Sequence, residues 1–291
     1  MQTLGESELI LTPEGEVYHL RLKPEHIADT ILLVGDPGRV AEISQNFEQI
    51  ECSISNREFV THTGIYKGKR ITALSTGIGT DNIDIVVQEL DALVNIDLQN
   101  RIIKNEKKSL NLIRIGTSGA IQREVEVDTP IVSEFAIGFD GLLNFYAERN
   151  MVCDLDFEEE FKHFTFWNDR LATPYIVKAS EKLSHLFAND IKKGITISAP
   201  GFYGPQNRVL RLALSDPLLG QKIEKFNYKN SKITNYEMEC SALYGLAKLL
   251  GHEALTVCII IANRKTKSFS KDYKEPMQKL IVSILDQAVL I

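Results

Sequence analysis

The stretch ALTVCIIIA, residues 254–262, is apolar at every position except Thr256. A run of this kind, rich in valine and isoleucine, is typical of a strand that is buried on both faces of a sheet. Similar runs recur along the chain, at residues 30–35, 70–76, 111–117, 129–137 and 195–199. Because stretches with helical spacing lie between them, we expect an α/β fold whose sheet is covered by helices on both faces.

Apolar residues spaced three or four positions apart mark the helices between these runs. In residues 81–97 this spacing brings Ile83 and Val86 to one face, together with the apolar residues that follow them. Residues 175–190 and 277–291 show comparable spacing. Each of these three segments is therefore predicted to be a helix.

The composition is that of an ordinary globular protein, with 44% hydrophobic and 25% charged residues. No linker rich in proline, glycine or serine interrupts the chain, so residues 1–291 are interpreted as a single domain. The irregular segment 139–170, which is rich in acidic and aromatic residues, is predicted to be an excursion on its surface.

Charge, apolar runs and cysteine spacing limit what the protein is expected to bind and where it is expected to be found. The formal net charge of −6 argues against a general nucleic-acid binder. No apolar run has the length of a membrane span, and no signal peptide is visible at the start. Four cysteines lie far apart without the spacing of a zinc site, at positions 52, 153, 240 and 258. These features predict reduced thiols and a cytoplasmic location.

Three of the predicted strands run into short segments with two glycines each: GDPGR (35–39), TGIG (76–79) and GTSG (116–119). Glycine allows backbone N–H groups to approach an anion closely. Arg39 and Arg114 stand beside two of these segments, and guanidinium groups suit phosphate oxygens. We therefore expect an anion site at glycine turns that end these strands, although one such turn alone is more typical of a tight connection. No segment matches a Walker A or G-x-G-x-x-G pattern, which disfavours mononucleotide and dinucleotide sites.

The stretch ITNYEMECSALYGLAKLLG, residues 233–251, places two carboxylates at the start of an apolar helix. Glu237 and Glu239 flank Met238, directly after a strand-like segment. Acidic residues in a first helical turn are stabilised by the positive end of the helix dipole, so a helix start alone accounts for both. A turn from strand to helix is also where α/β proteins bind ligands. The pattern leaves both interpretations open.

Seven short blocks resemble signature segments of the nucleoside phosphorylase-I family. They occur in the family's order: GDPGR (35–39), NREF (56–59), STGIG (75–79), IRIGTSGA (113–120), FYGPQNR (202–208), NYEME (235–239) and ANR (262–264). Among the members of the family, the blocks are most similar to those of uridine phosphorylases. The resemblance implies a single-domain α/β fold with a mixed β-sheet core flanked by helices on both faces. It also implies a reaction, in which uridine and phosphate give uracil and ribose 1-phosphate.

The resemblance further implies which residues contact each part of the substrates. Phosphate is expected on Gly35, Arg39, Arg57, Arg114 and Thr117. The ribose is expected against His19, Met238 and Glu239, and the base against Phe202, Gln206, Arg208, Ile261 and Arg264. In the family, the residues that match Arg57 and His19 reach into the site of a neighbouring subunit.

Glu239, Arg208 and Arg114 are the expected catalytic residues. Breaking the glycosidic bond builds positive charge on the ribose, and a carboxylate that holds the 2′- and 3′-hydroxyls favours that charge. The resemblance gives this role to Glu239, with Glu237 supporting it from behind. Uracil leaves with negative charge, which Arg208 is expected to stabilise, while the amide of Gln206 pairs with an N–H and a carbonyl of the base.

The resemblance implies no required cofactor, because phosphate is a co-substrate. Some bacterial relatives bind a monovalent cation, which would lie here at Glu58, Ile71 and Ser75. We expect a homo-oligomer with shared active sites, either a dimer or a hexamer, and no nucleic-acid or membrane partner.

Three other functions remain compatible with this fold. Purine nucleoside phosphorylases keep an aspartate at the place of Arg264, so the ANR block disfavours them. A nucleosidase uses water and has no need of the arginines at positions 39, 57 and 114. A protein that senses nucleosides without catalysis is the third alternative, because a fold alone does not define an activity.

Overall fold

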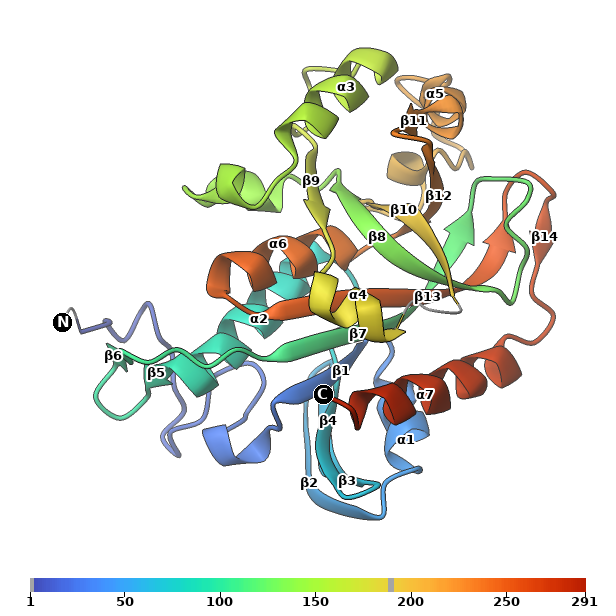
Figure 1. Ribbon diagram of the computed structural model, residues 1–291. Helices are drawn as coiled ribbons and strands as arrows, with labels where there is room; N and C mark the ends of the chain where they lie inside the picture. Colours follow the sequence, from blue (N-terminus) through green and yellow to red (C-terminus); the bar gives the residue numbers. More distant parts are fainter. Residues whose placement is uncertain (1–2, 188–190) are drawn as a thin grey trace.

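The computed structural model describes residues 3–187 and 191–291, and a large mixed sheet forms its centre (Figure 1). The sheet has 12 strands in the order β11-β12-β10-β8-β13-β7-β1-β4-β3-β2, with β9 beside β8 and β14 beside β13. Its strands are β1 Thr30–Val34, β2 Gln49–Asn56, β3 Phe59–Tyr66, β4 Lys69–Ser75, β7 Asn111–Ala120, β8 Pro130–Gly138, β9 Tyr175–Lys178, β10 Lys192–Ser198, β11 Asn227–Tyr228, β12 Ser231–Glu237, β13 Glu253–Asn263 and β14 Ser268–Phe269. A separate pair consists of β5 Ile96–Asp97 and β6 Ile102–Ile103.

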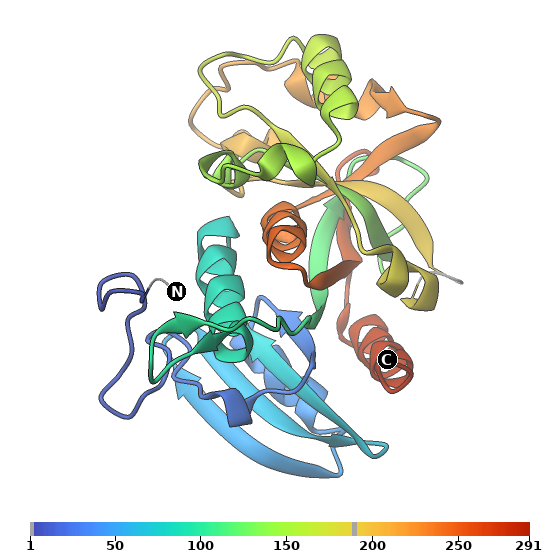
Figure 2. The same cartoon turned by 60° about the vertical axis from the view of Figure 1, so that its left-hand side comes forward.

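Helices cover both faces of this sheet (Figures 1 and 2). The α-helices are α1 Pro37–Ser44, α2 Thr80–Asn95, α3 Leu155–Thr165, α4 Glu181–Phe187, α5 Leu219–Lys225, α6 Cys240–Leu250 and α7 Lys274–Ala288, and short 3-10 helices cover Pro24–His26, Leu142–Phe145, Arg149–Met151 and Gly204–Gln206. α2 packs against α6 on one face, whereas α1, α4 and α7 lie on the other. The expected mixed α/β fold with two covered faces is confirmed.

All six apolar runs form strands, as predicted. The run at residues 254–262 is β13, which pairs with β7 in parallel and with β8 antiparallel. Its residues from Ala254 to Ile260 are all buried, which explains why no polar alternation interrupts them. The predicted helices at residues 81–97 and 277–291 are α2 and α7, although α2 ends at Asn95 and the next two residues form β5.

The prediction of one helix over residues 175–190 is wrong. Its first part is β9, which pairs antiparallel with β8, and α4 begins only after Ser180. Ser180 separates the two elements because its hydroxyl accepts the N–H of Leu183 over 3.1 Å, which caps the new helix. Residues 188–190 of this prediction lie outside the described residues.

The predicted turn at residues 116–119 is also wrong, because β7 continues through Ala120. The strand is paired with two neighbours at this point: β13 pairs with it up to Ala120, and β12 pairs antiparallel with Gly119 and Ala120. The glycines therefore belong to a strand at the meeting point of β7, β12 and β13.

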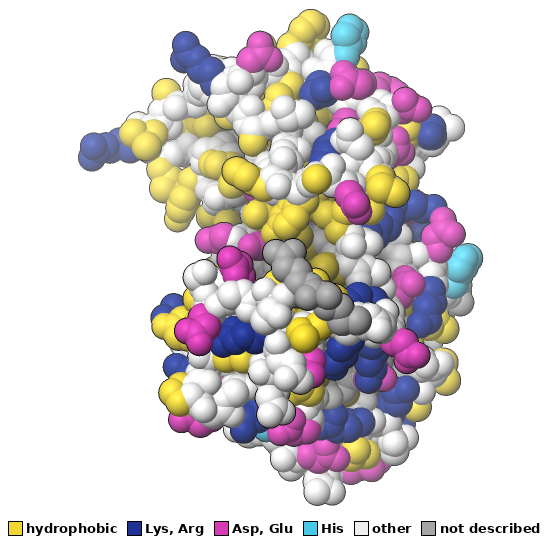
Figure 3. Space-filling view, turned by 90° about the vertical axis from the view of Figure 1, so that its left-hand side faces the viewer, with side chains coloured by type: hydrophobic (Ala, Val, Ile, Leu, Met, Phe, Trp, Pro, Cys, Tyr) yellow, Lys and Arg dark blue, Asp and Glu magenta, His cyan; other side chains and the backbone are white. Residues whose placement is uncertain are grey.

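The segment 139–170 is not merely an excursion on the surface. It contains α3, whose Phe157 and Phe161 are fully buried. These two rings pack with Phe226 in a second hydrophobic cluster, under β10 and β12. The segment thus completes the core of the half of the molecule that carries α3 and α5. Figure 3 shows hydrophobic side chains gathered in the hollow where this half meets the other.

A hairpin of β2 and β3 was not predicted from the sequence. β2 is exposed at most positions and lies at the edge of the sheet, so it lacks an apolar run. In the described part of the chain, no helix is both long enough and apolar enough to span a membrane.

Candidate active site

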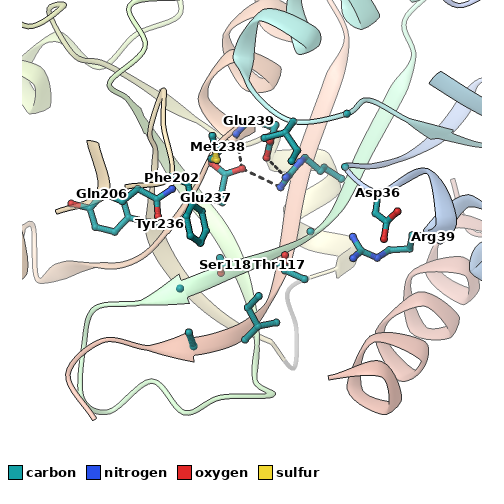
Figure 4. Close-up of a pocket in the computed structure, with 18 of the residues that line it drawn as sticks. Asp36, Arg39, Thr117, Ser118, Phe202, Gln206, Tyr236, Glu237, Met238 and Glu239 are labelled. Atoms are coloured by element: carbon teal, nitrogen blue, oxygen red, sulfur yellow. Dashed lines mark hydrogen bonds and ion pairs between the residues drawn. The ribbon is translucent and has the colours of Figure 1, made fainter. Parts of the chain in front are cut away.

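A cavity of about 640 Å³ lies where β1, β4 and β7 end beside the end of β12. Its size is that of a small-molecule site. The residues that line it come from segments far apart in the chain: Gly35, Asp36, Pro37, Arg39, Glu58, Gly77, Ile78, Asn82, Arg114, Gly116, Thr117, Ser118, Gly119, Phe202, Gln206, Arg208, Tyr236, Glu237, Met238, Glu239, Ile261, Ala262 and Phe269. Figure 4 shows part of this lining, with Arg39 and Asp36 on one side and Phe202 and Gln206 on the other.

One wall is formed by the turn from β1 into α1. Asp36 caps this helix, since its carboxylate accepts the N–H of Gly38 over 2.9 Å, and Pro37 occupies the first turn. Arg39 follows in the same turn and is buried against the cavity. A helix start with a buried arginine provides the donors that an anion needs.

Arg114, from β7, is buried between two carboxylates. Its Nη1 lies 3.1 Å from Oε2 of Glu237, and its Nη2 donates to Glu239. Burial alone would lower the pKa of Arg114, but the two carboxylates raise it above its usual value, so the guanidinium stays charged. Gly116 makes room for it: a Cβ at this position would lie 2.4 Å from Nη1 of Arg114.

Glu237 is the carboxylate that caps α6. It accepts the N–H of Glu239 over 2.8 Å and the N–H of Cys240 over 2.9 Å. The hydroxyl of Ser198 donates to its other oxygen over 2.5 Å. Burial raises the pKa of Glu237 to about 7, and Glu239 adds to this effect, although Arg114 opposes it.

Glu239 does not cap the helix that it begins. Its side chain makes no capping hydrogen bond. Instead its Oε1 accepts the N–H of Gly79 over 2.8 Å, while its other oxygen pairs with Arg114. Of the two interpretations of this stretch, the helix start describes Glu237, which caps α6. The ligand site describes Glu239, which lines the cavity with Met238 beside it.

The opposite end of the cavity carries an amide between two arginines. Oε1 of Gln206 accepts from Nη1 of Arg208 over 2.6 Å and from Nη2 of Arg264 over 2.7 Å. Because the amide oxygen is engaged by these donors, the amide nitrogen is the group of Gln206 left to bind a ligand. Burial and the charge of Arg208 lower the pKa of Arg264 to about 10. Arg208 also stacks on Phe202, with its Cζ 3.8 Å from the ring centre.

Arg264 differs from the other predicted base-binding residues. It is not one of the described residues that line the cavity, but it contacts two residues that do: it donates to Gln206, and its Cζ lies 4.5 Å from the ring centre of Tyr236. Ile261 does line the cavity, at a break in the pairing of β13 with β7.

Thr117 and Ser118 line the cavity between its two ends. The amide nitrogen of Asn235 donates to the hydroxyl of Ser118 over 3.0 Å. The amide oxygen of Asn235 lies 2.6 Å from the hydroxyl of Thr234, a length typical of an O–H···O bond, which fixes the orientation of the amide. The proton of Ser118 is therefore left for a ligand.

His19 and Arg57 do not line the cavity of their own chain. Nδ1 of His19 lies 2.6 Å from Oε1 of Glu89, and Asn56 donates to its backbone carbonyl over 2.7 Å. Arg57 follows in the exposed loop between β2 and β3, next to the cavity residue Glu58. The two predicted partner-reaching residues thus lie on one surface, at the side of the cavity.

The three predicted cation ligands are engaged within the chain or buried. The hydroxyl of Ser75 donates to the carbonyl of Glu58 over 2.6 Å and accepts the N–H of Val60 over 2.7 Å. The carboxylate of Glu58 accepts from Asn82 over 3.2 Å, and Ile71 is fully buried. A cation at these three residues stays a prediction.

Several lining residues were not predicted from the sequence. Tyr236 belongs to the NYEME block but has no role in the expected site, and Ile78 and Phe269 are exposed apolar residues that only the fold brings to the cavity. Asp36 lies in the GDPGR block, where its position before a proline is the signal of a helix cap.

The comparisons with known proteins agree with this fold. A sequence model of the phosphorylase superfamily matches residues 29–286. The chain therefore belongs to the phosphorylase superfamily. A uridine phosphorylase of Thermococcus kodakarensis is 32% identical over 268 residues, which cover 89% of this chain and 82% of the relative.

The descriptions of two other similar proteins give two different activities. A DeoD-type purine nucleoside phosphorylase of Listeria monocytogenes is 26% identical over 274 residues, which cover 93% of this chain and 98% of that protein. The crystal structure of a Trypanosoma brucei nucleoside phosphorylase, described as showing uridine phosphorylase activity, is similar with a TM-score of 0.85. It is 28% identical and covers 97% of this chain and 99% of that chain.

Proposed function

We propose that this protein is a uridine phosphorylase, which cleaves uridine with phosphate to give uracil and ribose 1-phosphate. The observation that carries the proposal is the end of the cavity where Arg208 and Arg264 hold Gln206. Uracil leaves with negative charge on its oxygens and ring nitrogen, and donors fixed in advance stabilise such charge. The uridine phosphorylase of Thermococcus kodakarensis and the Trypanosoma brucei enzyme support the same choice.

The phosphate would lie at the other end, between the start of α1 and β7. Gly35, Arg39 and Thr117 line the cavity, and they would offer the phosphate a backbone N–H, a guanidinium and a hydroxyl. Nε–H of Arg114 is buried and has no acceptor among the described residues. A buried donor without a partner is costly, and a phosphate oxygen would supply the missing acceptor.

Glu239 would hold the ribose between these two ends. Its carboxylate is fixed by Gly79 and Arg114 before any substrate binds. A negative charge fixed in this way stabilises the positive charge that grows on the ribose as the bond to uracil breaks. Arg114 contacts Glu239, which would hold the ribose, and it also lines the cavity, where its Nε–H would bind phosphate. It would therefore link the ribose site to the phosphate site.

We further propose a homo-oligomer in which His19 and Arg57 complete the site of a partner. Arg57 is exposed, and the side chain of His19 is 28% exposed, so both are free to meet another chain. Two copies that face each other across this surface would exchange these side chains. The four cysteines are free thiols, in keeping with the cytoplasmic location that the sequence predicts.

Base preference is the test of this proposal. With phosphate present, we expect rapid release of uracil from uridine and little release of base from inosine or adenosine. The physical reason is that Arg208 and the amide nitrogen of Gln206, whose oxygen is held by Arg264, are hydrogen-bond donors, which suit a uracil that leaves with negative charge. A purine leaving group instead needs an acid to protonate its ring nitrogen. The measurement is the initial rate for each nucleoside at equal concentration, followed by ultraviolet absorbance. A preference for inosine would contradict the proposal and favour a purine nucleoside phosphorylase.

A further inference from the structure

The end of β10 places a buried hydroxyl behind the carboxylates of the cavity. Ser198 is fully buried and is not among the described residues that line the cavity, so it touches no ligand there. Its Oγ accepts the backbone N–H of Ser241 over 2.8 Å. The single hydroxyl proton is therefore free to be donated to Glu237, whose Oε1 lies 2.5 Å away.

Glu237 in turn fixes the residues that would hold the ribose. Its carboxylate is held by the N–H groups of Glu239 and Cys240 and by the guanidinium of Arg114. Arg114 then pairs with the carboxylate of Glu239. A chain of contacts thus leads from Ser198 to Glu239 through two charged groups, all of them buried.

We propose that Ser198 is a positioning residue, which keeps Glu237 charged and in place behind the Arg114–Glu239 pair. The inference rests on the proposed function and adds to it a residue outside the cavity. It predicts that activity falls at low pH because Glu237 takes up a proton, and not because Glu239, which would hold the ribose, does so.

The surroundings of Glu237 make its charge sensitive to the loss of one donor. The charged or titratable groups that face it are Arg114 from β7, Cys258 from β13, and Glu239 and Cys240 at the start of α6. Burial raises the pKa of Glu237 to about 7, so its charge changes near neutral pH. Below that range a protonated Glu237 no longer balances Arg114, which is then drawn to Glu239 and competes with the ribose.

The direction of the effect follows from the hydrogen bond. A donor that bonds to a carboxylate favours the charged form and lowers its pKa. Removing the hydroxyl with Ser198→Ala is therefore expected to raise the pKa of Glu237. The acid limb of the pH profile of kcat/KM for uridine should move upward by about one pH unit. Phosphate ionises in the same pH range but does so identically for every variant, so the difference between variants reports the protein.

Two variants complete the design. Ser198→Thr keeps the hydroxyl and should leave the acid limb near that of the wild type. Ser133→Ala removes a fully buried hydroxyl from the neighbouring strand β8, where it bonds to Thr196 over 2.6 Å and not to the cavity. It should leave the limb unchanged. An unmoved limb in Ser198→Ala, or an activity that falls equally at every pH, would reduce Ser198 to a structural residue.

A second measurement does not depend on activity. The side-chain carboxyl of Glu237 can be followed by ¹³C NMR in protein labelled at glutamate, with Glu237→Gln identifying its signal. The signal should titrate at a higher pH in Ser198→Ala than in the wild type. Equal titration in both would overturn the inference. If the wild type does not cleave uridine with phosphate, the proposed function fails, whereas this titration still decides the role of Ser198.

Discussion

Replacing Glu239 by glutamine is expected to lower kcat/KM for uridine about a hundred-fold or more, roughly 2.7 kcal/mol of transition-state stabilisation. Glutamine keeps the size of the side chain and can still accept one hydrogen bond, but it lacks the charge that opposes the positive ribose. 2′-Deoxyuridine lacks one of the two hydroxyls that Glu239 would hold. The substitution should therefore penalise uridine more than 2′-deoxyuridine, which steady-state kinetics with both substrates measures.

The control is a buried carboxylate of the same kind outside the cavity. Glu158 pairs with Arg149 over 2.7 Å and is almost fully buried, as Glu239 is with Arg114. Glu158→Gln should lower stability but leave kcat/KM near that of the wild type. Equal penalties on the two nucleosides in Glu239→Gln, or a change in melting temperature alone, would give Glu239 a structural role only.

Replacing Arg114 by alanine is expected to raise the KM for phosphate about ten- to a hundred-fold, since a charge-assisted contact contributes roughly 1.5–3 kcal/mol. kcat should fall as well, because Glu239 loses the partner that orients it. The substitution also leaves Glu237 and Glu239 buried without a balancing charge, which costs about 3–5 kcal/mol of folding free energy. The measurement is the phosphate dependence of the rate at saturating uridine.

Two further variants separate binding from folding. Arg114→Lys keeps the positive charge but loses the planar fork, so the KM for phosphate should still rise while most of the stability returns. Arg149→Ala removes the partner of the buried Glu158, outside the cavity lining, and should lower stability without changing the KM for phosphate. Unchanged phosphate dependence in Arg114→Lys and Arg114→Ala would remove Arg114 from the phosphate site.

Continuous apolar runs predicted the central strands well, because burial on both faces leaves no room for polar residues. The failures follow from the same physics. Residues 175–187 mix a buried strand with a helix, and their apolar spacing fits both until Ser180 is recognised as a cap. β2 has no apolar signal because it lies at an exposed edge. The turn expected at residues 116–119 is a strand because β12 and β13 both pair with its end, a long-range contact that local sequence does not contain.

The sequence blocks predicted which residues form the candidate site, but not how these residues contact one another. The resemblance identified Arg114, Gln206 and Glu239, and the fold brings all three to one cavity. It did not show that Glu237 caps the helix while Glu239 does not, since two glutamates in one turn have the same local signal. Nor did it indicate Ser198, because a serine at the end of a strand has no distinctive pattern.

In the proposed reaction phosphate, not water, accepts the ribose. The most direct test is the fate of labelled phosphate when the protein acts on uridine. We expect one labelled ribose 1-phosphate for each uracil released, and almost no uracil when phosphate is left out. Free ribose as the product, or release of uracil at the same rate without phosphate, would contradict it.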